Sequence, residues 1–187
     1  QTMGAVFKKH PYRRPIIGDE STIGRITRDE MVKFFRQWYV PNRMVFVAVG
    51  DFDRLDMERK VKEVFEEFKP SDKLLPQREK EPEPQETQSV VSYGNFKETY
   101  LQLAVPITSA MDDETPALDA LAHILGGGEA SRLVQRVKLE KRLVHSISSS
   151  SFTPRDRGAF IIGATLPPEN VRKAIEEILA TLDDLSK

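Results

Sequence analysis

The chain has 187 residues, of which 39% are hydrophobic and 30% are charged, a composition typical of a globular protein and not of a disordered one. Its formal net charge of −1 provides no overall field that would attract nucleic acid or an anionic membrane. The absence of cysteine excludes disulfides and thiolate metal sites. No apolar run approaches the roughly 20 residues of a membrane span, so we expect no membrane-spanning segment.

A helix-strand-helix pattern follows an irregular entry segment that occupies residues 1–26. Thr27 and Glu30 form a capping box, which predicts a helix that ends at Pro41. The run from Met44 to Val49 is continuously apolar and rich in β-forming residues, and it predicts a strand buried on both faces. An N-cap at Asp53 then opens a second helix. The apolar positions of the two helices are Met31, Phe34, Phe35, Trp38, Leu55, Val61, Val64, Phe65 and Phe68.

A proline-rich segment separates this unit from the rest of the chain. Residues 69–87 place Pro70, Pro76, Pro82 and Pro84 among Lys, Glu and Gln, a composition that favours extended chain. We therefore place a domain boundary here, with residues 1–68 before a linker of residues 69–87 and a second domain in residues 88–187.

The second domain has the pattern β-β-α-α-β-β-α. The expected elements are strands 89–93 and 98–105 around a possible Gly94-Asn95 hairpin, helices 116–125 and 130–139, strands 143–151 and 158–166, and a helix after Pro167 and Pro168. Strands beside helices predict an α+β fold with a mainly antiparallel sheet and helices packed on one face. The N-terminal α-β-α unit before the linker would be separate from this domain.

Three consecutive glycines stand between the two predicted middle helices, within the segment Leu125 to Leu133. Glycine ends a helix readily and lets another backbone come close. A helix break is therefore expected, while a substrate-recognition loop remains an equal alternative to a purely structural one. Arg132 follows in a first helical turn, where a cation is unfavourable. It would contact either a substrate or partner domain, or a neighbouring acid such as Glu129.

Several short motifs occur in a fixed order. They are His10-Pro11-Tyr12, Pro15-Ile16-Ile17-Gly18, Ile26-Thr27, Trp38-Tyr39, Pro41-Asn42, Met44, Gly50-Asp51, Leu125 to Leu133, and Ser146-Ile147-Ser148. With these motifs the chain resembles the pitrilysin/insulinase/mitochondrial-processing-peptidase family of zinc metallopeptidases. The resemblance implies repeated α+β domains that enclose a peptide-binding chamber. It also implies that residues 1–68 end a zinc-type domain whose sheet the α-β-α unit completes.

The chain departs from the family pattern in two ways. The zinc signature H-x-x-E-H is absent, and the three histidines, His10, His123 and His145, have no ligand spacing, so we assign no catalytic residue and no metal ligand. The family's substrate-clamping Arg and Tyr fall at Lys138 and His145. Lysine lacks the planar fork of arginine, and imidazole titrates near neutrality. The resemblance assigns substrate contacts to Gly126, Gly127, Gly128, Ser131, Arg132, Lys138 and His145.

The sequence thus predicts the carboxyl-side, non-catalytic portion of a zinc metalloendopeptidase, which would form part of the peptide-binding chamber. No cofactor is expected in this fragment, while zinc is expected in the full-length parent. The expected partners are a peptide or unfolded protein substrate, the preceding zinc-bearing domain and further copies or subunits in a homo- or hetero-oligomer. The alternatives are a fragment of a catalytically inactive structural subunit of the same family and an unrelated α+β binding module. The compartment is not defined; a bacterial cytoplasm or periplasm is the expectation.

Overall fold

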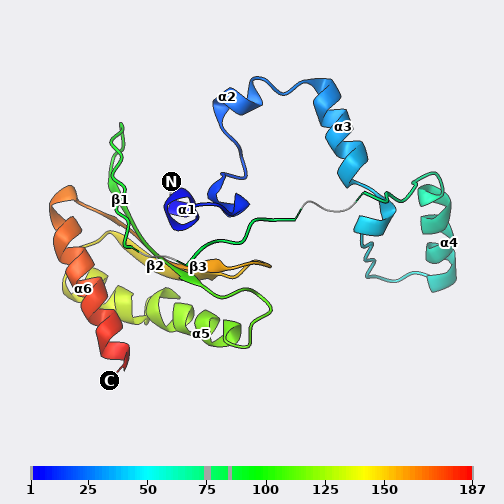
Figure 1. Ribbon diagram of the computed structural model, residues 1–187. Coiled ribbons are helices and arrows are strands. Elements are labelled where there is room, and N and C mark those ends of the chain that lie inside the picture. Colours follow the sequence, from blue (N-terminus) through cyan, green and yellow to red (C-terminus); the bar gives the residue numbers. More distant parts are fainter. Residues whose placement is uncertain (1, 74–76, 84–85, 187) are drawn as a thin grey trace. The chain divides into compact units, whose positions relative to one another are not determined.

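The computed structural model describes residues 2–73, 77–83 and 86–186, and it divides into two compact units (Figure 1). Unit 1 consists of residues 1–14 and 79–187, and unit 2 of residues 15–78. Residues 1–14 therefore fold with the part of the chain that follows the proline-rich segment. Pro76 and Pro84 of that segment lie outside the described residues. The domain limits proposed from the sequence stay a prediction.

A three-stranded antiparallel sheet organises unit 1. It contains β1 (Thr99–Ile107), β2 (Ser146–Phe152) and β3 (Gly158–Leu166), in the order β1-β3-β2. The register places Leu103 opposite Ile162 and Ile162 opposite Ser149. The predicted α+β class and antiparallel pairing are confirmed, and β3 has the predicted ends. The alternation of side chains along each strand gives the sheet one apolar face and one face of smaller, more polar residues.

Helices cover the apolar face of this sheet, as Figure 1 shows for α5 (Thr115–Gly126) and α6 (Val171–Asp183). Between them in sequence lies a π-helix, η3 (Val134–Glu140). Each fully buried aliphatic side chain contributes about 1.5–3 kcal/mol. The core comprises Ala122, Leu125, Leu133, Val134, Val137, Val144, Ile147, Phe160, Ile162, Ala164, Leu166, Ala174 and Ile178. The remaining short elements are α1 (Thr2–Val6), η1 (Pro11–Arg13), η4 (Pro168–Asn170) and η5 (Asp184–Ser186).

Unit 2 contains helices α2 (Glu20–Ile23), α3 (Arg28–Trp38) and α4 (Arg54–Phe65), with a single turn η2 (Pro41–Arg43) after α3. The predicted capping box is present, because the Thr27 hydroxyl accepts from the backbone N–H of Glu30 and Glu30 accepts from that of Thr27. Asp53 caps α4 by accepting from the backbone N–H of Asp56 at 2.8 Å. Local sequence signals therefore define where these two helices begin.

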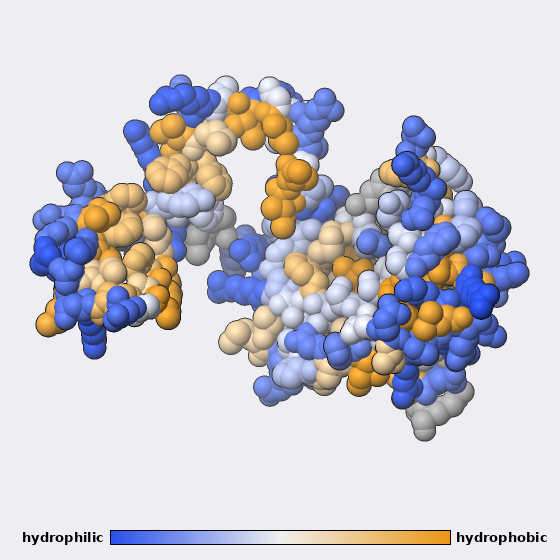
Figure 2. Space-filling view, turned by 180° about the vertical axis from the view of Figure 1, so that it is seen from behind, coloured by the Kyte–Doolittle hydropathy of each residue, from blue (hydrophilic) through white to orange (hydrophobic). Residues whose placement is uncertain are grey.

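The prediction of a buried strand from Met44 to Val49 is wrong. Among the described residues of unit 2 this run forms no strand, and Val47 is 76% exposed. A strand needs a neighbour to satisfy its backbone groups, and residues 15–73 and 77–78 of unit 2 form only helices and irregular chain. The apolar positions of α3 are exposed too, with Phe34 at 57%. Apolar side chains, orange in Figure 2, consequently reach the molecular surface.

Two further expectations for unit 1 are corrected. Residues 89–93 form no strand, so the hairpin around Gly94-Asn95 is absent; Phe96 instead donates its backbone N–H to Gly94 in a tight turn. The helix expected over 130–139 becomes regular later, at Arg132, and widens into η3. The backbone N–H of Lys141 accordingly bonds to the carbonyl of Arg136, five residues earlier.

Candidate functional site

The triple glycine forms the junction between α5 and the strand β2. A Cβ on Gly126 would lie 2.2 Å from the backbone nitrogen of Ser149, so only glycine permits the end of α5 to approach β2 this closely. The hydroxyl of Ser149 donates to the carbonyl of Ala122 at 2.7 Å and fastens the same junction. A side chain on Gly127 would collide with His123, whereas one on Gly128 would meet nothing within 4 Å. Gly128 has a φ of +142°, a conformation that favours glycine.

Ser131 is buried, with 7% of its surface exposed, and its hydroxyl donates to the carbonyl of Gly128 at 2.5 Å. Leu125 and Leu133, which bound the segment, are fully buried in the core. Most of the segment therefore has a packing role that explains its residue types. Arg132, in contrast, is exposed at the first turn after the glycines.

The two positions aligned with the family clamp pair with different carboxylates. Lys138 Nζ lies 3.4 Å from Glu129 Oε1, so the cation interacts with the loop after the glycines. His145 Nε2 lies 3.9 Å from Glu98 Oε1, just before β1, and 55% of its side chain is exposed. The backbone N–H of His145 donates to the carbonyl of Thr165 at 2.7 Å. Glu129 thus pairs with Lys138, not with Arg132.

The described residues include no group of three His, Asp or Glu side chains placed to hold a metal ion. His10 pairs with Asp156, His123 lies beneath Gly127 and His145 faces Glu98. Three histidines with three separate environments do not fit a zinc site, which needs converging ligands.

Asn42 and Arg43 fasten the start of the proline-rich segment to unit 2. The sequence predicted no such role for them. The side-chain amide of Asn42 donates to the carbonyl of Ser71 at 2.9 Å and accepts from its backbone N–H at 3.1 Å. Arg43 donates to the carbonyls of Gln37 and Lys73. The start of the proline-rich segment is thereby held against unit 2.

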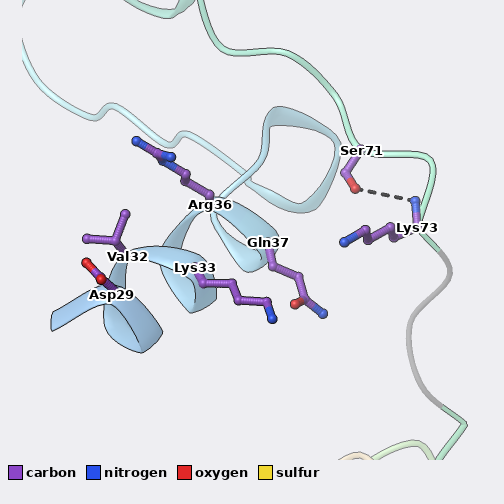
Figure 3. A pocket seen from close by; sticks show the side chains of 7 residues that line it. All are labelled: Asp29, Val32, Lys33, Arg36, Gln37, Ser71 and Lys73. Atoms are coloured by element: carbon purple, nitrogen blue, oxygen red, sulfur yellow. Dashed lines mark hydrogen bonds between the residues drawn. The ribbon is translucent and has the colours of Figure 1, made fainter. Parts of the chain in front are cut away.

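A shallow pocket lies beside this attachment (Figure 3). Its volume is about 420 Å³, and its walls come from α3 and from Ser71 and Lys73. The cations Lys33 and Arg36 line it together with Asp29, and all of these side chains are exposed. Exposed surface charges of mixed sign do not define a ligand.

Comparison with known proteins identifies the family. The family model described as "Peptidase M16 inactive domain" matches residues 25–187. The chain belongs to the M16 peptidase family. It is 28% identical over 191 residues to an uncharacterized zinc protease of Mycobacterium leprae, covering 96% of this chain and 42% of that protein. It is 29% identical to zinc protease PqqE of Helicobacter pylori, covering 95% of this chain and 41% of that protein.

Solved M16 structures agree with this placement. A protease from Helicobacter pylori superposes with a TM-score of 0.87 at 27% identity, covering 96% of this chain and 44% of that one. The peptidase M16 inactive domain from Pseudomonas fluorescens gives 0.85 at 26% identity, covering 98% of this chain and 44% of that one. The chain therefore spans less than half the length of the M16 relatives it matches. No helix in the described ranges is long and apolar enough to cross a membrane.

Proposed function

We propose that this chain is the non-catalytic portion of an M16 zinc metalloendopeptidase, contributing chamber wall and substrate contacts. The match of residues 25–187 to the inactive domain carries the proposal. Relatives named zinc proteases support peptide-bond hydrolysis as the activity of the whole protein. The zinc would be held by residues outside this chain, because its own histidines do not converge.

The face of the sheet opposite α5 and α6 is the candidate chamber wall. Tyr100, Gln102, Ser148 and Gly163 share this face, by the register of the strands. A Cβ on Gly163 would meet nothing within 4 Å, so the face is open at this position, while Thr2 of α1 donates to Gln102 and borders it. Small and hydrogen-bonding side chains over an open sheet suit an extended peptide, whose own backbone groups need partners.

The proposed wall is tested by placing a photoactivatable amino acid at Ser148, with a matched position at exposed Arg172 on α6. An unfolded protein such as casein should crosslink at position 148 several-fold more than at position 172. Equal crosslinking at both positions would argue against the wall.

Unit 2 is proposed to complete the sheet of a preceding zinc-type domain. The run from Met44 to Val49 supports this, because it has β-forming residues, forms no strand among the described residues of unit 2 and leaves Val45, Val47 and Val49 largely exposed. Adding the upstream domain of the same protein should protect the amides of this run from hydrogen exchange. Unchanged exchange on adding that domain would contradict the proposal.

The rival function is that of a structural subunit that lacks H-x-x-E-H even at full length. The similarity to a chain of Complex III2 from Candida albicans, with a TM-score of 0.72 at 15% identity, shows a shared fold alone and does not favour it. The named zinc proteases among the relatives favour the peptidase. The presence or absence of H-x-x-E-H in the full-length protein decides between the two.

A further inference from the structure

The carboxylate of Glu81 binds three consecutive backbone amides near the start of the chain. It accepts from the N–H groups of Lys8 at 2.6 Å, Lys9 at 2.9 Å and His10 at 2.7 Å. Successive amides that converge on one carboxylate form a small anion-binding concavity, and charge-assisted bonds of this kind are stronger than neutral ones. Glu81 comes from the proline-rich segment, so it joins two stretches that are 71 to 73 residues apart.

His10 fixes the same stretch from its other side. Its side chain is 4% exposed, and its Nε2 lies 3.2 Å from Asp156 Oδ2 in the turn between β2 and β3. Its Nδ1 accepts from the backbone N–H of Tyr12 at 3.3 Å, so the neutral ring carries its proton on Nε2 and donates to Asp156. Both ring nitrogens are thereby used in holding residues 10–12 to the sheet.

Aromatic packing completes this attachment. Phe7 is 1% exposed and meets Tyr12 edge-on, with ring centroids 5.7 Å apart. Tyr12 in turn meets Phe152 of β2 edge-on at 5.9 Å. Edge-to-face pairs contribute about 0.5–1.5 kcal/mol beyond their buried area. The motif His10-Pro11-Tyr12 therefore has a concrete role in this chain, which is attachment to the second half of the protein.

A second ionic contact lies two residues further along the proline-rich segment. Glu83 pairs with Arg157 in the β2–β3 turn, next to Asp156. Residues 81 and 83 therefore contact both the start of the chain and the same turn that His10 contacts. Asn42 and Arg43 hold residues 71 and 73 on unit 2.

We propose that Glu81 and His10 form a clasp that locks residues 7–13 and 79–83 together on unit 1, so that the two chain crossings to unit 2 start from neighbouring anchor points. The clasp consists of the Glu81 carboxylate, the amides of residues 8–10, and the His10–Asp156 pair. Two adjacent crossings restrict unit 2 more than one crossing does, because each limits rotation about the other. The clasp would thus set the range of movement of unit 2 relative to unit 1.

The clasp is tested by Glu81→Gln, with Glu79→Gln as the matched control on an exposed carboxylate two residues earlier. Hydrogen exchange in the chain should accelerate about tenfold or more at Lys8, Lys9 and His10 in Glu81→Gln. Exchange in β3 should stay within twofold of the parent. Unchanged exchange at residues 8–10, or an equal acceleration throughout β3, would overturn the clasp.

A distance measurement tests whether Glu81 restricts the movement of unit 2 and does not only order residues 8–10 locally. The chain has no cysteine, so Glu67→Cys in unit 2 and Glu169→Cys in unit 1 allow site-specific spin labelling. The distribution of label distances should broaden when Glu81→Gln is added and keep its width when Glu79→Gln is added. Equal widths in all three proteins would show that Glu81 does not restrict the crossings. Neither measurement depends on peptidase activity, so the clasp and the proposed function can fail separately.

Discussion

Gly126 is the glycine at which an added side chain should destabilise unit 1 most clearly. Gly126→Ala places a methyl group 2.2 Å from the backbone nitrogen of Ser149, and a backbone cannot yield as a side-chain end can. The free energy of unfolding of unit 1 should fall by at least about 2 kcal/mol, since overpacking typically costs 1–3 kcal/mol. Urea denaturation measures it. Gly163→Ala, where nothing lies within 4 Å, is the control and should change stability by less than about 0.5 kcal/mol.

The pH dependence of stability should report on Glu81. Burial would raise its pKa, but the amides of His10, Lys8 and Lys9 outweigh burial and hold the pKa below its ordinary value of 4.5. A depressed pKa in the folded state means that the stabilisation is complete above about pH 4.5 and is lost as the pH falls through the folded-state pKa. The stability difference between parent and Glu81→Gln should therefore be constant near neutrality and shrink in acid. A difference that grows as the pH falls would contradict this assignment.

At the scale of elements, Arg136 joins η3 to α6. Its guanidinium donates to Glu177 at 3.0 Å and to Asp184 at 2.6 Å, and these bonds raise its pKa. Arg136→Lys keeps the charge but loses the planar fork, so it should lower the melting temperature of the chain. Arg172→Lys is the matched control, because Arg172 pairs with Glu176 within one exposed helix turn. Equal effects of the two substitutions in thermal denaturation would contradict the proposed bridge.

Short sequence patterns predicted those elements whose limits are set by neighbouring residues in the chain. The strand Gly158–Leu166 has the predicted ends, and the Thr27–Glu30 capping box defines the start of α3. The run from Met44 to Val49 could not be predicted in the same way, because its pattern records a preference for strand without saying whether a partner strand is present. The strand predicted over residues 89–93 is absent for the same reason: its pattern does not say whether a partner strand is present. The π-turn of η3 leaves no residue signature that we can identify.

Some features of the candidate site could be predicted from the sequence and others could not. The sequence predicted that the triple glycine permits close backbone approach, and Gly126 confirms it. The contacts of Glu81 and Asn42 were missed, because each joins residues distant in sequence and resembles a solvated surface residue in the pattern alone. The substrate contacts assigned to Lys138 and His145 remain a proposal.

At the scale of the whole molecule, the exposed apolar surface of unit 2 should make this chain associate. Phe34, Phe46 and Val47 are each more than half exposed. Sedimentation should therefore show concentration-dependent association, with binding of a hydrophobic dye. Val47→Lys should weaken both signals, while Lys60→Glu on α4 should leave the dye signal unchanged. A chain that stays monomeric and binds no dye would contradict an uncovered face.

We propose that Lys138 and His145 occupy the positions of the family's substrate-clamping arginine and tyrosine, in which case the full-length protein should need a partner for efficient cleavage. The double variant Lys138→Arg with His145→Tyr should raise kcat/KM of the full-length protein by about tenfold or more, as added transition-state donors do. The single Arg172→Lys variant controls for surface change. An unaltered kcat/KM in the double variant would contradict the proposal that positions 138 and 145 form the substrate clamp.

We propose that this chain is part of a zinc peptidase but does not itself cleave peptides. The most direct test measures hydrolysis of a quenched fluorescent peptide library by the isolated chain and by the full-length protein, each with zinc and with a chelator, together with any clamp-bearing partner. We expect no chelator-sensitive cleavage by the chain and chelator-sensitive cleavage by the full-length protein with its partner. Robust, zinc-dependent cleavage by the isolated chain, or a full-length protein that lacks H-x-x-E-H and cleaves nothing, would contradict it.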